Sequence, residues 1–340
     1  MLDDLKFIHN RDGQDALGIA EKKWQQLLNV FELPHIPLKV SNVVYAGMGG
    51  SALAALVAKS WPGLSLPFEV CRNYQVPTYV SRDTLFIAAS YSGNTEETLS
   101  ALAEAEVAGA QIFIITGGGK LKEWAETKDY PFLVLPKVVQ PRFADFYNLV
   151  AIVSILDAVG ITTNKLDELP GTADFLKKEV ESWLPTVPID KNPAKKLAQE
   201  LAGKSLAVYG GPLMAPVAYK WKINFNESAK NVAWWNELPE FDHNELTGWT
   251  SHPVDKPYGI VEIRSNLEHA RVQQRFEVGE RLLSGRRPAP HVVEAQGETL
   301  LEQIVWSINF GDFVAIYLAL INNQDPSPVD LVEKFKKELG

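Results

Sequence analysis

The chain has 340 residues, of which 46% are hydrophobic and 22% are charged, as expected for a soluble globular protein with room for two ordinary domains. The net charge of −9 argues against nucleic acid as the main partner, because a phosphate backbone is bound by a concentrated basic surface. The single cysteine excludes an intramolecular disulfide and a thiolate metal cluster, and it favours a reducing compartment.

The N-terminal segment, Met1 to Lys6, lacks the basic region and the apolar core of a signal peptide, and no later stretch has the character of a membrane span. We therefore expect a cytoplasmic protein with no membrane partner. Apolar residues at helical spacing then predict a helix over residues 16–33, which Pro34 ends.

Four apolar, strand-like runs follow, separated by segments rich in Ala, Leu, Glu and Lys such as residues 97–108. The runs cover residues 42–46, 85–89, 111–116 and 132–135. Strands that alternate with helices predict a parallel sheet with helices on both faces. An apolar helix over residues 148–159 ends this first half.

A charged connection marked by Gly and Pro, residues 160–174, indicates a domain boundary. Beyond it the pattern starts again, because a strand over 204–209 leads into Gly210-Gly211-Pro212, and a further strand covers 258–264. A mostly apolar helix over 300–321 is predicted to be buried. The sequence thus predicts an α/β protein with two similar halves, domains 1–160 and 161–340.

Two turns that follow predicted strands have the composition of phosphate sites. In one, Ser90, Ser92 and Thr95 supply hydroxyl groups around a glycine at the start of a helix. In the other, residues 47–51 combine glycines with Ser51 at a helix start. The alternative is an ordinary capped helix start. The spacing fits neither a nucleotide P-loop nor a dinucleotide fingerprint, so a phosphorylated small molecule is the favoured ligand and no nucleotide cofactor is expected.

A second concentration of polar groups extends from residue 224 to residue 249. Moving a proton between adjacent carbons needs a carboxylate over a C–H bond and an acid that can protonate a ring oxygen, and Glu227 and His243 are the candidates. Taken singly, a glutamate in a helix is usually a solvated surface residue and a histidine in a loop is usually a structural hydrogen-bonding residue, so only the context favours the catalytic interpretation. Acidic residues beside His243 raise the possibility of a metal, but no second histidine lies at ligand spacing, so no metal is expected.

Arg142 lies in the loop between the last strand of the first half and an apolar helix, where loops commonly line a ligand crevice. It could stabilise a negatively charged intermediate, or it could simply pair with Asp145. The last predicted helix, 330–339, carries Lys334, Lys336 and Lys337, of which most are expected to be solvated.

Taken together, these motifs resemble the bifunctional phosphoglucose/phosphomannose isomerases of the sugar isomerase (SIS) domain superfamily. The resemblance covers nearly the whole chain. Its motifs are Gly47-Met48-Gly49-Gly50-Ser51, Ser90-Tyr91-Ser92-Gly93-Asn94-Thr95, Gln140-Pro141-Arg142, Asn226-Glu227, Pro239-Glu240, His243-Asn244-Glu245, Gly248-Trp249 and Asp325-Pro326-Ser327-Pro328-Val329. The resemblance implies two SIS domains, each a flavodoxin-like three-layer α/β/α sandwich with a five-stranded parallel sheet, and a homodimer.

The same resemblance implies a role for each site residue. The sugar phosphate would be held by Gly50, Ser51, Ser90, Ser92 and Thr95. Glu227 would carry a proton between C1 and C2, with Arg142 beside it, and His243 from the neighbouring subunit would assist ring opening. Lys336, with Lys334 as the alternative, would help to bind the sugar. Ser327 stands where threonine is commoner and would affect dual specificity. No redox cofactor and no metal would be required.

The favoured activity is therefore an aldose–ketose isomerase that forms fructose 6-phosphate from glucose 6-phosphate and from mannose 6-phosphate. One alternative is a non-catalytic SIS sugar-phosphate sensor, although no DNA-binding segment is evident. The other is a SIS isomerase for a different sugar phosphate.

Overall fold

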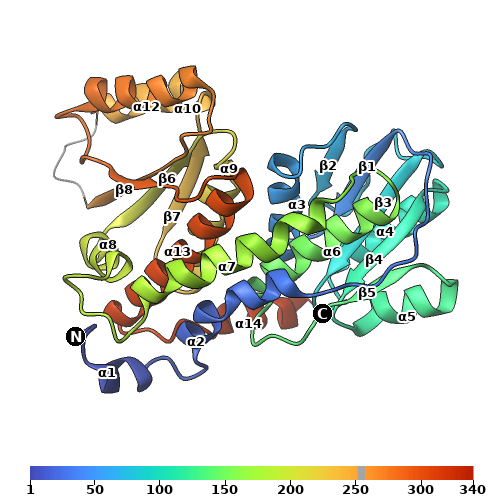
Figure 1. Cartoon of the computed structure of the whole chain (residues 1–340), viewed down its shortest axis with the longest axis horizontal. Coiled ribbons are helices and arrows are strands. Elements are labelled where there is room, and N and C mark those ends of the chain that lie inside the picture. Colours follow the sequence, from blue (N-terminus) through green and yellow to red (C-terminus); the bar gives the residue numbers. More distant parts are fainter. Residues whose placement is uncertain (252–256, 340) are drawn as a thin grey trace. The chain divides into compact units, whose positions relative to one another are not determined.

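The computed structural model describes residues 1–251 and 257–339 and divides into two compact units (Figure 1). Residues Lys23–Asp174 form what we call the N-terminal unit. Met1–Lys22 together with Phe175–Gly340 form the C-terminal unit. The division at 160/161 expected from the sequence lies before this boundary, which falls inside helix α7 (Leu169–Val180).

The N-terminal unit is built on a five-stranded parallel sheet with the order β2-β1-β3-β4-β5. Its strands are β1 (Asn42–Ala46), β2 (Phe68–Cys71), β3 (Thr84–Ser90), β4 (Gln111–Thr116) and β5 (Phe132–Val134). This is the flavodoxin-like strand order. The four predicted strands are confirmed to within one residue at each end, whereas β2 was not predicted.

Helices cover both faces of this sheet, as predicted. They are α3 (Gly49–Ser60), α4 (Glu96–Val107), α5 (Gly119–Lys128) and α6 (Asp145–Ala158). Apolar residues of α4 and α5 form one core with alternate residues of β1, β3 and β4. On the strands this core uses every second side chain, because successive side chains of a strand point to opposite faces. Helices α3 and α6 pack against each other and contact the sheet as well.

The C-terminal unit contains a parallel sheet with the order β7-β6-β8-β9. Its strands are β6 (Ser205–Gly210), β7 (Ala233–Glu237), β8 (Tyr258–Arg264) and β9 (His291–Glu294). Over the described residues this sheet has four strands, so the expected fifth strand is wrong for this half. The sequence also missed β7 and β9, and it treated the β7 segment as part of a loop.

Helix α9 (Ala215–Glu227) packs on β6 and β7, while α10 (Glu240–His243), α11 (Glu245–Gly248) and α12 (Ala270–Leu283) follow β7 and β8. A core of nine buried residues joins α10, α12 and Trp249 to β6 and β8. The remaining helices of this unit are α1 (Leu5–His9), α2 (Ala16–Glu21), α8 (Pro193–Leu201), α13 (Leu300–Ile321) and α14 (Asp330–Leu339).

Helix α13 confirms the predicted buried apolar helix and packs against α2, α8 and α9. By length and composition α13 could cross a membrane, but almost all of it is buried inside the protein, as in the core helix of a soluble protein.

The helix predicted over 16–33 is wrong in extent. The α-helical part ends at Glu21, and a 3₁₀ helix continues from Lys23 to Leu28. The interruption coincides with the passage of the chain from one compact unit to the other, between Lys22 and Lys23.

Candidate functional site

Three hydroxyl groups converge in the loop between β3 and α4. The Oγ atom of Ser90 lies 2.8 Å from Oγ1 of Thr95 and 3.3 Å from Oγ of Ser92. Thr95 is the N-cap residue of α4 but makes no side-chain capping bond, so the capping interpretation does not account for its hydroxyl. The hydroxyls lie beside the first turn of a 12-residue helix, whose free N–H groups and dipole favour an anion.

Gly93 gives this loop its shape. Its φ is +71°, and a Cβ atom there would lie 1.7 Å from the carbonyl oxygen of Gly118. Gly119, at the start of α5, also leaves no room for a side chain, because its Cβ would lie 2.4 Å from the carbonyl oxygen of Ser92. The two loops that follow β3 and β4 therefore interlock through glycines. The second loop was not predicted, although three consecutive glycines, 117–119, directly after a strand were the signal for it.

The predicted second phosphate turn lies beside Arg142. Gly50 is in the first turn of α3, and a Cβ atom on it would lie 3.3 Å from the Cα atom of Arg142. Ser51 is buried, and the hydroxyl of Tyr45 on β1 donates to its carbonyl oxygen at 3.0 Å. A Cβ atom on Gly47 would lie 3.0 Å from the carbonyl oxygen of Ala89 on β3. The loops after β1 and β3 and the loop that carries Arg142 thus meet at the carboxyl ends of the strands.

Arg142 is buried, with 3% of its surface exposed, in the 3₁₀ helix Pro141–Phe143. Its guanidinium lies 4.9 Å from the centroid of the Phe143 ring. Asp145, the alternative partner considered for Arg142, forms a buried ion pair of 2.7 Å with Lys23. The carboxylate therefore has a cationic partner of its own.

Glu227 is the last residue of α9 and is partly exposed. The N–H of Ala233, the first residue of β7, donates to Oδ1 of Asn226 at 3.0 Å and fixes this helix end beside the start of the strand. Because α9 connects two parallel strands, it runs opposite to them. Glu227 therefore lies at the amino-terminal edge of the sheet.

His243 is the last residue of α10 and is exposed. Its helix follows the carboxyl end of β7, where the N–H of Leu238 donates to the carbonyl oxygen of Gly210 at 2.9 Å. Within one chain, Glu227 and His243 thus lie at opposite ends of β7. Five residues of strand separate the two edges by roughly 13–16 Å.

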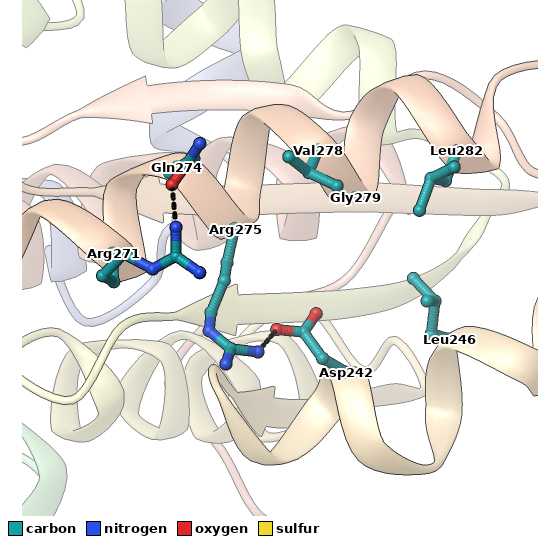
Figure 2. A pocket seen from close by; sticks show the side chains of 8 residues that line it. All are labelled: Asp242, Leu246, Arg271, Gln274, Arg275, Val278, Gly279 and Leu282. Atoms are coloured by element: carbon teal, nitrogen blue, oxygen red, sulfur yellow. Dashed lines mark hydrogen bonds and ion pairs between the residues drawn. The ribbon is translucent and has the colours of Figure 1, made fainter.

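A cavity of about 300 Å³ lies between α10–α11 and α12 (Figure 2). One end is polar, and there the guanidinium of Arg275 pairs with Asp242 at 2.7 Å. The other end is apolar, with Leu246, Val278 and Leu282. None of the predicted site residues lines this cavity, although Asp242 is the neighbour of His243 in the chain.

Both candidate lysines of α14 are exposed. Lys336 pairs with Glu333 at 2.8 Å, and Lys334 lies 3.8 Å from Glu338. Over residues 1–251 and 257–339, no group of three or more His, Cys, Asp or Glu side chains is placed to hold a metal ion. The structure therefore brings six predicted residues together in the N-terminal unit, namely Gly50, Ser51, Ser90, Ser92, Thr95 and Arg142. Glu227 and His243 lie at opposite edges of the sheet in the C-terminal unit, and the two lysines lie on its last helix, α14.

Comparisons with known proteins find one matching family in each of the two compact units. Residues 38–161 match the SIS domain family, and residues 190–339 match the family described as the bacterial phospho-glucose isomerase C-terminal SIS domain. A bifunctional phosphoglucose/phosphomannose isomerase of Caldicellulosiruptor bescii is 34% identical over 88% of this chain and 90% of its own. A D-glucosamine-6-phosphate 4-epimerase of Sulfolobus acidocaldarius is 36% identical over 67% of this chain and 71% of its own.

A solved structure supports the fold. A glucose-6-phosphate isomerase-like protein of Thermus thermophilus aligns with a TM-score of 0.66 at 20% identity, over 97% of this chain and 99% of that chain. The resemblance expected from the motifs is therefore confirmed, and the chain belongs to the family of bifunctional phosphoglucose/phosphomannose isomerases.

Proposed function

We propose that the protein is an aldose–ketose isomerase that interconverts glucose 6-phosphate, and also mannose 6-phosphate, with fructose 6-phosphate. The observation that carries this proposal is the hydroxyl cluster of Ser90, Ser92 and Thr95 at the start of α4. Hydroxyl and backbone N–H donors beside a helix N-terminus bind a phosphate monoester. The family of the chain supplies the class of reaction.

The chemistry assigned to the other residues is a proton transfer through a cis-enediol. Glu227 removes the proton from C2 of the open-chain aldose, and the electron pair forms the C1–C2 double bond as the C1 oxygen gains charge. Arg142 offsets the negative charge of this enediolate. Glu227 then returns the proton to C1, while the hydroxyl proton of the C2 oxygen passes to the C1 oxygen, so the C2 oxygen becomes the ketone and the C1 oxygen a hydroxyl. The atoms balance without an external oxidant or reductant.

His243 assists opening of the sugar ring in this proposal, and Lys336 helps to bind the sugar. Glu227 and His243 of one chain lie at opposite ends of β7, so a single C-terminal unit does not bring them to one substrate. This separation supports a homodimer in which His243 reaches the site of the neighbouring chain. The cytoplasm is the proposed compartment, as for other metabolic isomerases that use soluble sugar phosphates.

Turnover of both epimers requires room near C1 and C2, and Ser327 is the residue proposed to provide it. Ser327 lies in the segment that connects α13 to α14 and is fully buried. Its N–H donates to Oδ1 of Asp325 at 2.9 Å. Its side chain is smaller than the threonine usual in the family. Replacement of Ser327 by Thr is expected to change the ratio of the two activities more than their sum.

The epimerase relative supports a second candidate, action on an amino-sugar phosphate at another carbon. One experiment separates the candidates. The purified protein is incubated separately with glucose 6-phosphate, mannose 6-phosphate and glucosamine 6-phosphate, with and without a chelator, and the products are identified. Fructose 6-phosphate from the first two, resistant to the chelator, supports the proposal. A C4 epimer of the third supports the epimerase, and binding without turnover supports a sensor.

A further inference from the structure

The short helices α10, which ends at His243, and α11 are held by a buried arginine that the proposed chemistry does not use. Arg287 follows α12 in the chain, and only 5% of its surface is exposed. Its guanidinium carbon lies 5.6 Å from the ring centroid of Tyr209, 5.8 Å from that of Phe241 and 5.9 Å from that of Trp249. A guanidinium within about 6 Å of a ring face is attracted to it. Arg287 thus touches the residue two before His243 and the first residue after α11.

The charge of Arg287 is fixed in place by Glu262 on β8. Nη2 of Arg287 donates to Oε1 of Glu262 at 2.6 Å, and both side chains are buried. The other oxygen of Glu262 accepts from Arg264 at 2.6 Å. Breaking a buried ion pair from one side is costly, so the orientation of Arg287 is set by the sheet.

A second contact holds the other side of His243. The hydroxyl of Tyr209 donates to Glu245, and Nδ2 of Asn236 donates to the same carboxylate at 2.7 Å. The rings of Tyr209 and Phe241 are also in contact, with centroids 4.8 Å apart. Residues 241 and 245 are therefore both tied to the sheet, and His243 is the exposed residue midway between them.

The neighbouring helix α12 adds one more contact, the pair between Arg275 and Asp242 at the polar end of the cavity (Figure 2). This pair is partly exposed, so salt and solvent weaken it. Arg287, by contrast, is a buried cation, and it contacts rings on both sides of His243.

We propose that Arg287 is a positioning residue that acts through His243: it fixes residues 241–249 so that the exposed imidazole is presented in one orientation. The inference rests on the proposed role of His243. Arg264 serves as the control for loss of an arginine from the same ion-pair network. It also binds the carboxylate of Glu262, but its ring partner is Phe276 of α12, at 5.2 Å.

The test is a double-mutant cycle with Arg287→Met and His243→Ala, measured as kcat/KM for glucose 6-phosphate and corrected for the folded fraction at each condition. In the wild-type background Arg287→Met is expected to lower kcat/KM by about 10- to 100-fold, the size of effect that a misplaced catalytic group produces. In the His243→Ala background the same change is expected to cost less than about twofold, because the group it positions is gone. Arg264→Met is expected to show no such dependence on His243.

If Arg287→Met does not fold, Tyr209→Phe replaces it in the cycle, because that change removes only the hydroxyl that holds Glu245. Equal losses in both backgrounds would overturn the proposal and leave Arg287 a purely structural residue. Amide hydrogen exchange of residues 240–251 is a readout that needs no activity. Faster exchange there in Arg287→Met, but not in Arg264→Met, supports the anchoring even if the wild-type protein turns over no sugar phosphate. In that case the proposed function fails instead.

Discussion

A single hydrogen atom in place of a side chain decides the geometry of the proposed phosphate loop. Gly93 has a φ of +71°, and a Cβ atom on it would collide with the carbonyl oxygen of Gly118. Gly109, after α4, has a nearly equal φ of +74° but open space around it. A side chain at Gly93 would therefore meet both backbone strain and a collision with the neighbouring loop, whereas one at Gly109 would meet backbone strain alone.

Replacement of Gly93 by Ala is expected to destabilise the protein by about 1–3 kcal/mol and to weaken substrate binding, because the β3–α4 loop must move away from Gly118. The measurements are urea unfolding and the KM for glucose 6-phosphate. Gly109→Ala introduces the backbone strain without the collision, so this variant should be less stable than wild type but have the same KM. Equal KM values for the two variants would show that the interlocked glycines do not shape the binding loop.

Replacement of Glu227 by Gln is expected to abolish proton transfer while leaving the phosphate loop intact, because Glu227 belongs to the C-terminal unit and the hydroxyls to the other. Loss of a general base costs roughly 10²–10⁴-fold in rate. Turnover and equilibrium binding of glucose 6-phosphate are measured on the same preparation, with the exposed Glu298→Gln as the matched control. A Glu227→Gln variant with normal turnover would exclude this residue as the base.

At the scale of the elements, the sequence was most informative where burial is complete, although it also predicted the short edge strand β5. Strands β1, β3, β4, β6 and β8 have nearly every residue buried, and each lies inside its sheet between two neighbours. Such strands form continuous apolar runs. Strands β2, β7 and β9 lie at sheet edges, have only four or five residues and are half exposed, as Trp234 shows with 54% exposure. Their composition does not distinguish them from loops.

The site divides in the same way. Ser90, Ser92 and Thr95 are neighbours in the sequence, so their convergence was predictable from a strand followed by a helix. The approach of Gly118 to Gly93, and of Arg142 to Gly50, depends on which loops meet at the sheet edge. The separation of Glu227 from His243 depends on β7, which the sequence did not reveal.

The loop after β6 looks like a repeat of the loop after β1 in sequence but holds a carboxylate instead of hydroxyls. Glu268 is buried, and it accepts from the N–H of Leu213 at 2.8 Å. A Cβ atom on Gly211 would lie 2.4 Å from Oε1 of Glu268. The glycine of this half therefore makes room for the protein's own anionic side chain.

Burial raises the pKa of Glu268 above its ordinary value of 4.5, and the hydrogen bonds from Leu213 and Met214 only partly oppose this. Because the folded state holds the proton more tightly, the contribution of Glu268 to stability is complete below pH 4.5 and is lost as the pH rises through the folded-state pKa. Glu268→Gln does not titrate, so its free energy of unfolding should improve relative to wild type as the pH rises from about 4 to 8. Urea unfolding across this range measures the difference, with Glu277→Gln as the exposed control on α12. A difference independent of pH would contradict the account.

For the whole molecule, the central geometric fact is that each chain carries its Glu227 and its His243 at opposite edges of one sheet. The homodimer proposed above resolves this separation by combining the glutamate of one chain with the histidine of the other. Closed twofold dimers are the commonest assembly of soluble chains, and they create two equivalent sites of this kind.

Mixing inactive Glu227→Gln and His243→Ala homodimers, followed by exchange of subunits, is expected to restore activity. In a mixed dimer one site loses both residues and the other has both intact, so random exchange should recover about a quarter of the wild-type rate. Mass measurement in solution confirms that the exchanging species are dimers. If both residues of a site come from the same chain, every site in the mixture keeps one defect and no activity returns.

The central claim is that one base carries a proton between C2 and C1 of a sugar 6-phosphate. The most direct measurement is to incubate the protein with glucose 6-phosphate deuterated at C2 and to follow the label by NMR. The account predicts fructose 6-phosphate with deuterium at C1, together with label released to water by exchange at the enediol stage. Formation of no ketose, or recovery of a product that still carries all its deuterium at C2, would contradict it.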